Sequence, residues 1–159
     1  MIELDHGIRL KGTSLWLDAT RVKDFSFVSH AHQDHVAAHR NIICSTKTAR
    51  LFRRPMPKAK IMAHPFHTPF DQDHLKLELY PAGHILGSSQ ILIEKGHTRI
   101  VYTGDFKLRK NIGWAAECGL HNQDIARDWL GRLGCEAFLE FEVARIDNSG
   151  LVFFNQDLG

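Results

Sequence analysis

The most constraining feature of this chain is the run His30-Ala31-His32-Gln33-Asp34-His35, which directly follows an apolar segment. His30, His32 and Asp34 are two residues apart, so on an extended backbone their side chains point to the same side. His35 joins them if the chain turns at once. Because imidazole and carboxylate groups are ligands of zinc, the run predicts a metal site at the end of a strand over residues 25–29.

Two later segments carry residues of the same chemical kind. His84 directly follows an expected strand and lies between Gly83 and Gly87, which let the backbone bend close to a metal. Asp105 ends the run Val101-Tyr102-Thr103-Gly104-Asp105. A carboxylate at a strand end is well placed to bridge two cations, which lie about 3.5–4 Å apart in two-metal sites. Both residues are therefore candidate metal ligands.

Hydrophobic periodicity predicts an α/β protein that is rich in short strands. The expected strands cover residues 2–10, 14–17, 25–29, 42–44, 60–63, 75–80, 89–94 and 98–102, with a hairpin turn at 95–97. A short basic helix is expected from Ser45 or Thr46 to Arg54, where Pro55 stops it. Residues 122–133 are helix-like, and residues 138–144 and 151–154 resemble strands. No Pro/Gly/Ser-rich linker interrupts the chain, so a single domain over residues 1–159 is expected.

Composition and charge point to an ordinary globular protein. Of the 159 residues, 43% are hydrophobic and 24% charged, which excludes the disordered class, and the net charge of +2 does not by itself indicate a nucleic-acid binder. Cys44, Cys118 and Cys135 are odd in number and lack C-x-x-C spacing, which favours reduced thiols and a cytoplasmic location. The sequence has neither a signal-peptide pattern nor an apolar stretch of membrane-spanning length, so no membrane association is expected.

Together these motifs resemble the metallo-β-lactamase fold superfamily and, within it, the β-CASP-type nucleases. That branch includes the mRNA 3′-end processing exonucleases and the bacterial DNA-ligase-associated exonucleases. The resemblance rests on the H-x-H-x-D-H run at 30–35, on Ala-Gly-His-Ile-Leu-Gly-Ser at 82–88 and on Tyr-Thr-Gly-Asp-Phe-Lys-Leu-Arg at 102–109. It covers residues 1–112.

The resemblance implies a fold, a cofactor and a reaction. The fold would be an αββα sandwich, and the enzyme a zinc-dependent hydrolase that cleaves phosphodiester bonds in RNA or single-stranded DNA with a metal-activated water, as in RNA processing. One zinc would be held by His30, His32 and His84, and the other by Asp34, His35 and Asp105, with Asp105 bridging. Asp34 would be the catalytic residue that orients or deprotonates the water. Mn²⁺ or Fe²⁺ would also suit the oxygen-rich second site.

After Lys110 the chain departs from the family pattern. It lacks the Thr-Tyr-Gly-like motif and the further histidine of the second zinc site, and His121 fits a solvated helix start better than a ligand. We therefore expect the N-terminal half of such an enzyme, joined to a divergent tail over residues 113–159, with an incomplete second site that would impair activity. One sheet would then expose the face that its partner normally covers, unless a second copy, a partner chain or the tail covers it.

Other readings remain open from the sequence. A hydrolase of the same fold acting on a small ester or thioester would share the 30–35 run, and a catalytically silent metal- or nucleic-acid-binding protein would explain the incomplete second site. His64 and His67 are either loop residues or substrate contacts. The most basic stretch is either a solvated helix face or a phosphate-backbone contact; it comprises Arg50, Arg53, Arg54, Lys58 and Lys60.

Overall fold

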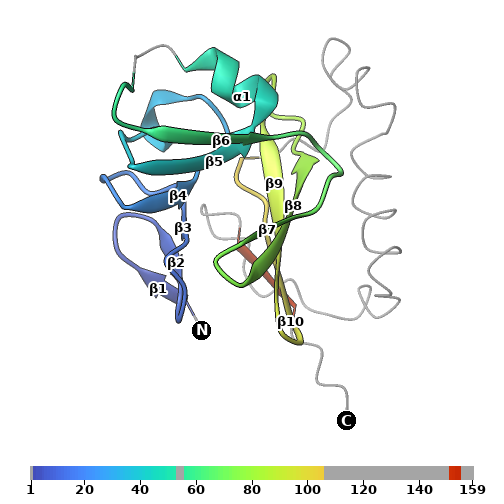
Figure 1. The fold of residues 1–159 in the computed structure, drawn as a ribbon. Coiled ribbons are helices and arrows are strands. Elements are labelled where there is room, and N and C mark those ends of the chain that lie inside the picture. Colours follow the sequence, from blue (N-terminus) through green and yellow to red (C-terminus); the bar gives the residue numbers. More distant parts are fainter. Residues whose placement is uncertain (1, 53–55, 106–150, 155–159) are drawn as a thin grey trace.

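The computed structural model describes residues 2–52, 56–105 and 151–154, which form two β-sheets (Figure 1). Sheet A has the strand order β1-β2-β3-β4-β5-β6. Its strands are β1 (Ile2–Leu4), β2 (Ile8–Leu10), β3 (Trp16–Leu17), β4 (Phe25–Phe27), β5 (Asn41–Ser45) and β6 (Lys60–His64). The strands β1 to β3 pair antiparallel, whereas β3 to β6 pair parallel.

Sheet B is antiparallel throughout and has the order β11-β10-β9-β8-β7. Its strands are β7 (Phe70–Gln72), β8 (Leu75–Pro81), β9 (Ser89–Lys95), β10 (Thr98–Tyr102) and β11 (Leu151–Phe154). The expected hairpin turn at residues 95–97 joins β9 to β10, and Gly96 takes the positive φ of 59° that this turn requires.

The two sheets face each other across one hydrophobic core. Alternation along β8 buries Leu75, Leu77 and Leu79, and these leucines share a cluster with Phe27 of β4 and Ile43 of β5. Among the described residues, the inner face of each sheet is therefore covered by the other. The expectation of a sheet face without its partner is wrong for this part of the chain, because β7 to β10 already supply the second layer.

A short helix covers the outer face of sheet A. The helix α1 (Thr46–Leu51) begins where the Ser45 side chain accepts a hydrogen bond from the Thr48 amide at 3.0 Å, as expected for a capped start. Ala49 packs on the outward-facing Ile42 and Cys44. The helix was expected to reach Arg54, but α1 ends at Leu51 and Phe52 is extended; Arg53 and Arg54 lie outside the described residues.

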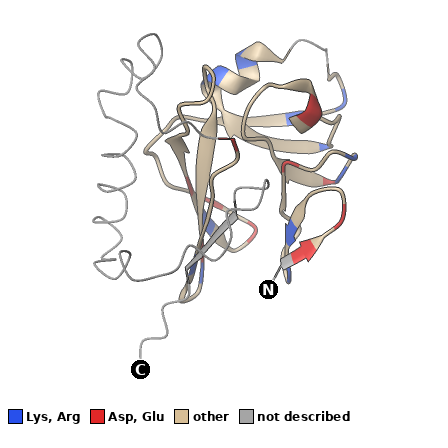
Figure 2. Cartoon of the chain, turned by 180° about the vertical axis from the view of Figure 1, so that it is seen from behind, with Lys and Arg blue, Asp and Glu red and all other residues tan. Residues whose placement is uncertain are grey.

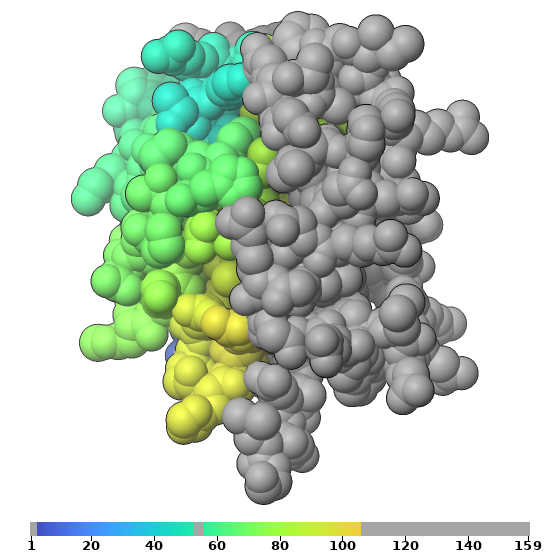
Figure 3. Space-filling model, turned by 90° about the vertical axis from the view of Figure 1, so that its right-hand side faces the viewer, coloured from blue at the N-terminus to red at the C-terminus, as the bar shows by residue number. Residues whose placement is uncertain are grey.

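The strand directions gather several strand ends at one edge of the molecule. Because β3 to β6 are parallel, their carboxyl ends lie together, and α1 starts from this edge. In sheet B, β8 and β10 both pair antiparallel with β9, so their carboxyl ends also lie side by side. The Ser29 carbonyl accepts a hydrogen bond from the Ser89 amide at 2.9 Å and joins the two sheets there. Figure 3 shows α1 (cyan) and the β9–β10 turn (yellow) at opposite ends of the molecule.

Several expectations differ in detail. The expected strand over residues 2–10 is split into β1 and β2, because His6 and Gly7 take positive φ angles of 50° and 149°. The three-residue β7 was not expected, since it is too short to show a period. The strand expected at 151–154 is observed as β11, while the helix at 122–133 and the strand at 138–144 lie outside the described residues. In the described ranges, no helix has the length and apolarity that a membrane span needs.

Candidate metal centre

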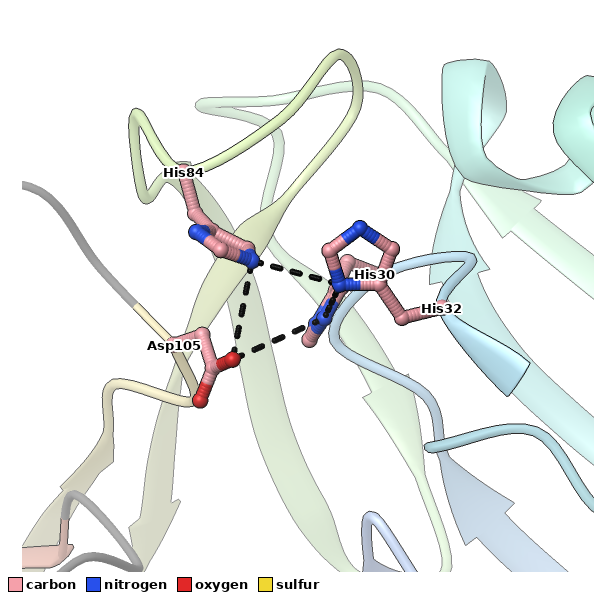
Figure 4. Close-up of side chains that lie close together, drawn as sticks. All are labelled: His30, His32, His84 and Asp105. Carbon is pink, nitrogen blue, oxygen red and sulfur yellow. Dashed lines mark hydrogen bonds and ion pairs between the residues drawn. The ribbon is translucent and has the colours of Figure 1, made fainter. Parts of the chain in front are cut away.

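Four side chains from three distant segments meet at the shared edge of the two sheets. His30, His32, His84 and Asp105 each point one possible ligand atom at a common centre, and these atoms all lie within 4.8 Å of one another (Figure 4). His30 is buried in the loop after β4, His84 follows β8, and Asp105 follows β10. The candidate ligands that the sequence placed at separate strand ends thus form one spatial cluster.

The distances within this cluster suit a tetrahedral cation. His32 Nδ1 lies 3.0 Å from His30 Nε2 and 3.3 Å from His84 Nε2. Asp105 Oδ2 lies 3.8 Å from His30 Nε2 and 3.5 Å from His84 Nε2. A tetrahedral zinc with donors at about 2.0–2.1 Å holds those donors roughly 3.3 Å apart. These four donor–donor distances are therefore close to the spacing that such an ion needs.

The electrostatics of His30 favour the neutral imidazole. Burial, followed by the nearby His35, lowers the pKa of His30 to about 4, so this ring is uncharged near neutral pH. A neutral imidazole is the form that binds a metal. His30 Nδ1 lies 2.9 Å from Ser29 Oγ, so a hydrogen on Nδ1 leaves the lone pair of Nε2 facing the cluster.

A second group of donors adjoins the first. His35 and Asp34 belong to the 3₁₀ helix η1 (Gln33–His35), which supplies the turn that the sequence required after His32. His35 Nε2 lies 3.7 Å from Asp34 Oδ2 and 3.9 Å from Asp105 Oδ2. The same Asp105 oxygen thus faces both groups. The Asp34 side chain is 79% exposed, so it is open to an incoming molecule.

Asp18 is a buried carboxylate behind both groups, and sequence reasoning missed it. Its Oδ2 lies 3.2 Å from His35 Nδ1 and accepts hydrogen bonds from Ser29 Oγ at 2.5 Å and from the Tyr102 hydroxyl at 2.9 Å. Its Oδ1 accepts a hydrogen bond from the Ser29 amide at 2.7 Å. The hydrogen bond to Asp18 raises the pKa of His35, although burial opposes the rise.

This arrangement lets one carboxylate orient both imidazoles. Asp18 holds His35 directly and His30 through the Ser29 hydroxyl, so both rings turn Nε2 toward the centre. Carboxylates behind metal-binding histidines fix the ring orientation and raise ligand basicity. The sequence did offer a signal for Asp18, because this carboxylate directly follows the strand β3, and a carboxylate at a strand end was also the reason for selecting Asp105.

Close backbone packing brings Asp105 to the centre. Gly104 has a positive φ of 53°, and a Cβ placed on it would lie 2.7 Å from the Ser29 Cβ. Only glycine allows this approach. On the other side, the Ser88 hydroxyl accepts hydrogen bonds from the His84 and Ile85 amides at 3.0 and 3.2 Å and holds the His84 loop.

The other histidines make different contacts. His39 is buried, and its Nδ1 accepts the Lys23 amide hydrogen at 3.0 Å. His64 stacks on Phe70 with 3.5 Å between the ring centroids, and His67 meets Tyr80 edge-on at 5.1 Å. His67 lies in a turn, as the loop reading expects, but the reading of His64 as a loop residue is wrong, because His64 ends β6 and pairs with Ser45 of β5. His121, the histidine considered as a missing ligand, lies outside the described residues.

Comparison with known proteins finds relatives of the part of the chain that carries these motifs. A probable DNA ligase of Opitutus terrae is 45% identical over 115 residues, covering 69% of this chain and 11% of the ligase. Protein artemis of Mus musculus is 27% identical, covering 69% and 20%, and 5′ exonuclease Apollo of Gallus gallus is 28% identical, covering 82% and 31%. No family model matches the chain.

The chain spans between about a tenth and a third of the length of these curated relatives. They share its N-terminal part, in which the H-x-H-x-D-H run, His84 and Asp105 lie. The N-terminal portion of this chain is thus related to the metallo-β-lactamase-type nucleases of the β-CASP branch.

Proposed function

We propose that the chain is a metal-dependent phosphodiesterase of the nuclease type, acting on RNA or single-stranded DNA. The observation that carries this proposal is the convergence of His30, His32, His84 and Asp105 within 4.8 Å of one another, from strand ends of both sheets. A relative named 5′ exonuclease supports the nucleic-acid substrate. We also propose an αββα sandwich and a single domain over residues 1–159, for which the two facing sheets and the outer helix α1 are the described support.

The side chains divide into two proposed ligand sets. His30, His32 and His84 hold the first ion, and Asp34, His35 and Asp105 the second, with Asp105 shared because its Oδ2 faces both sets. Zinc suits the first set, which is rich in imidazole, and Mn²⁺ or Fe²⁺ would also suit the second. Bound ions of this kind lower the pKa of water and stabilise the charge that develops on a phosphate in the transition state.

The exposed carboxylate of Asp34 is the proposed catalytic residue. It lies beside both His35 and the open side of the cluster, so it can accept a hydrogen bond from an incoming water and orient it. Asp18 and Ser29 keep the imidazoles in the required tautomers, as their hydrogen bonds indicate. The His84 loop and the Gly104 turn fix the remaining donors.

A binding protein without catalysis is the second candidate. The described part of the second ligand set contains two carboxylates and one imidazole, so the second ion would be held less firmly than the first. With one tightly bound ion, the chain would bind metal or nucleic acid without turnover. This candidate predicts one metal ion per chain, whereas the enzyme predicts two.

Metal content and cleavage decide between these candidates. We expect protein purified without added metal to contain close to two ions per chain, and to cleave labelled single-stranded RNA or DNA in a reaction that a chelator abolishes. Asp34→Asn should lower the chelator-sensitive rate by at least a hundredfold, which general acid–base catalysis of this kind contributes. Asp71→Asn, an exposed change on β7, serves as the matched control. Undiminished cleavage by Asp34→Asn would assign the activity to a contaminant.

A further inference from the structure

The basic residues of the chain are unevenly distributed. Residues 35–70 contain seven Lys and Arg residues and no Asp or Glu, although the whole chain has a net charge of only +2. This segment begins at His35 in the proposed metal centre and forms β5, α1 and β6. The small net charge of the whole chain therefore hides a strongly basic segment next to the centre in the sequence.

Lys47 lies where α1 starts, at the same edge of the molecule as the metal centre, and Arg50 follows one turn further along the helix. Lys47 and Arg50 are three residues apart on α1, so they share one face of the helix, and both are exposed. Figure 2 shows the Lys and Arg positions of α1 in blue at the top of the molecule. The helix starts at the carboxyl end of β5, next to the end of β4 from which the His30 loop emerges.

The helix is fastened to the loop that carries His84. The hydroxyls of Ser45 and Thr48 both donate to the Gly87 carbonyl, at 2.6 and 2.8 Å. The backbones are so close that a Cβ on Gly87 would lie 2.9 Å from the Lys47 Cβ. Lys47 thus projects from the border of the His84 loop, and its position relative to the centre is fixed by buried hydrogen bonds.

The remaining cations of the segment lie elsewhere. Lys58 precedes β6 and Lys60 begins it, and Arg40 directly precedes β5, so these three lie at the amino ends of the parallel strands. Arg40 is paired with Asp24 at 3.2 Å. Within the described part of the segment, Lys47 and Arg50 are therefore the cations of the helix that starts at the catalytic edge.

We propose that Lys47 and Arg50 form a docking strip for the phosphates that flank the scissile bond, and that this strip makes the site selective for a polynucleotide chain. The inference rests on the proposed nuclease function. A phosphodiester bound at the metal centre of a nucleic acid carries further phosphates on its neighbours, each with one negative charge. Contacts to those phosphates position the chain without reading its sequence. A small phosphodiester has no flanking phosphates and gains nothing from the strip.

The test compares two double variants of equal charge in the full chain. Lys47→Gln/Arg50→Gln removes the strip, and Lys58→Gln/Lys60→Gln removes the same charge at the opposite edge. Glutamine suits both helix and exposed positions, so both proteins should retain a cooperative melt. Binding of a single-stranded oligonucleotide is measured by fluorescence anisotropy between 50 and 200 mM salt, and hydrolysis is measured on the oligonucleotide and on bis(p-nitrophenyl) phosphate.

Loss of the strip should lower the slope of log affinity against log salt by about 1.4, since each phosphate contact to a single strand contributes about 0.7. The KM for the oligonucleotide should rise roughly tenfold, while turnover of the small diester should not change. The Lys58→Gln/Lys60→Gln variant should match the parent protein in the salt slope and in the KM for the oligonucleotide. Equal effects of the two variants, or an equal loss on the small diester, would overturn the docking strip.

Failure of the proposed function gives a different pattern. If the parent protein hydrolyses neither substrate, the nuclease proposal fails, while the binding measurement still tests the strip. A parent protein that hydrolyses the small diester but shows no salt-dependent binding of the oligonucleotide overturns the strip and leaves the metal-dependent hydrolysis standing.

Discussion

At the scale of single residues, Asp18 distinguishes this site from an incidental group of histidines. Its carboxylate contacts His35 directly and reaches His30 through Ser29, while Tyr102 donates to it from sheet B. A surface cluster of imidazoles would not need such buried support. The cost of burying this carboxylate is offset by the hydrogen bonds that it accepts.

Asp18→Asn tests this positioning role. The amide keeps the shape of the side chain but loses the charge that orients His35, so we expect affinity for the second ion to fall by about 10–100-fold. The first ion should lose less affinity than the second, because Asp18 reaches only one of its proposed ligands, His30, and only through the Ser29 hydroxyl. Stepwise zinc titration by calorimetry separates the two affinities, and a merely structural role would lower both together.

The matched control is Asp24→Asn. Asp24 pairs with Arg40 at an exposed position, and its loss should leave both zinc affinities unchanged. An Asp18→Asn protein that binds two zinc ions as tightly as the parent would remove Asp18 from the site.

At the scale of elements, the site depends on how closely two loops pack. The turn after β10 brings Gly104 against Ser29, so that the loops of the two sheets touch behind the donors. A positive φ and a close contact coincide at this glycine. These two requirements can be separated experimentally, because Gly96 in the β9–β10 turn has a similar φ without any contact within 4 Å.

Gly104→Ala should therefore disrupt the centre, whereas Gly96→Ala should not. Both changes incur the strain of a left-handed residue, about 1 kcal/mol. Only Gly104→Ala also pushes the Asp105 turn away from Ser29, so we expect it alone to weaken zinc binding, by at least tenfold. Urea denaturation measures the strain that both variants share. Zinc titration measures the difference in zinc affinity between them. Equal zinc affinity in the two proteins would show that the Gly104 contact does not position Asp105.

The elements also show what the sequence could and could not reveal. Strong periods, such as Leu75, Leu77 and Leu79 on β8, predicted their strands correctly because burial alternates with the backbone. The strand β7 was missed because three residues show no period. Asp18 was missed because its partners Ser29, His35 and Tyr102 are distant in sequence, so that only the folded chain shows their contacts.

At the scale of the whole molecule, the proposed metal ions join the two sheets. His30 and His32 follow a strand of sheet A, and His84 and Asp105 follow strands of sheet B. A cation held by all four closes the edge of the sandwich at which both sheets end. Because the unfolded chain does not preform this site, metal binding should stabilise the folded state.

Thermal unfolding measures this coupling. Free zinc at a hundred times its dissociation constant adds about 2.7 kcal/mol of stability, which for a chain of this length corresponds to a rise in Tm of roughly 5–10 °C. His84→Gln removes a donor from sheet B and should abolish most of that rise with little effect on the Tm in chelator. His97→Gln, an exposed change in the β9–β10 turn at the other end of the molecule, should keep the full rise. If zinc raised the Tm of the His84→Gln protein as much as that of the parent, the ion would not be held between the sheets, and its site would have to be sought within the 30–35 run alone.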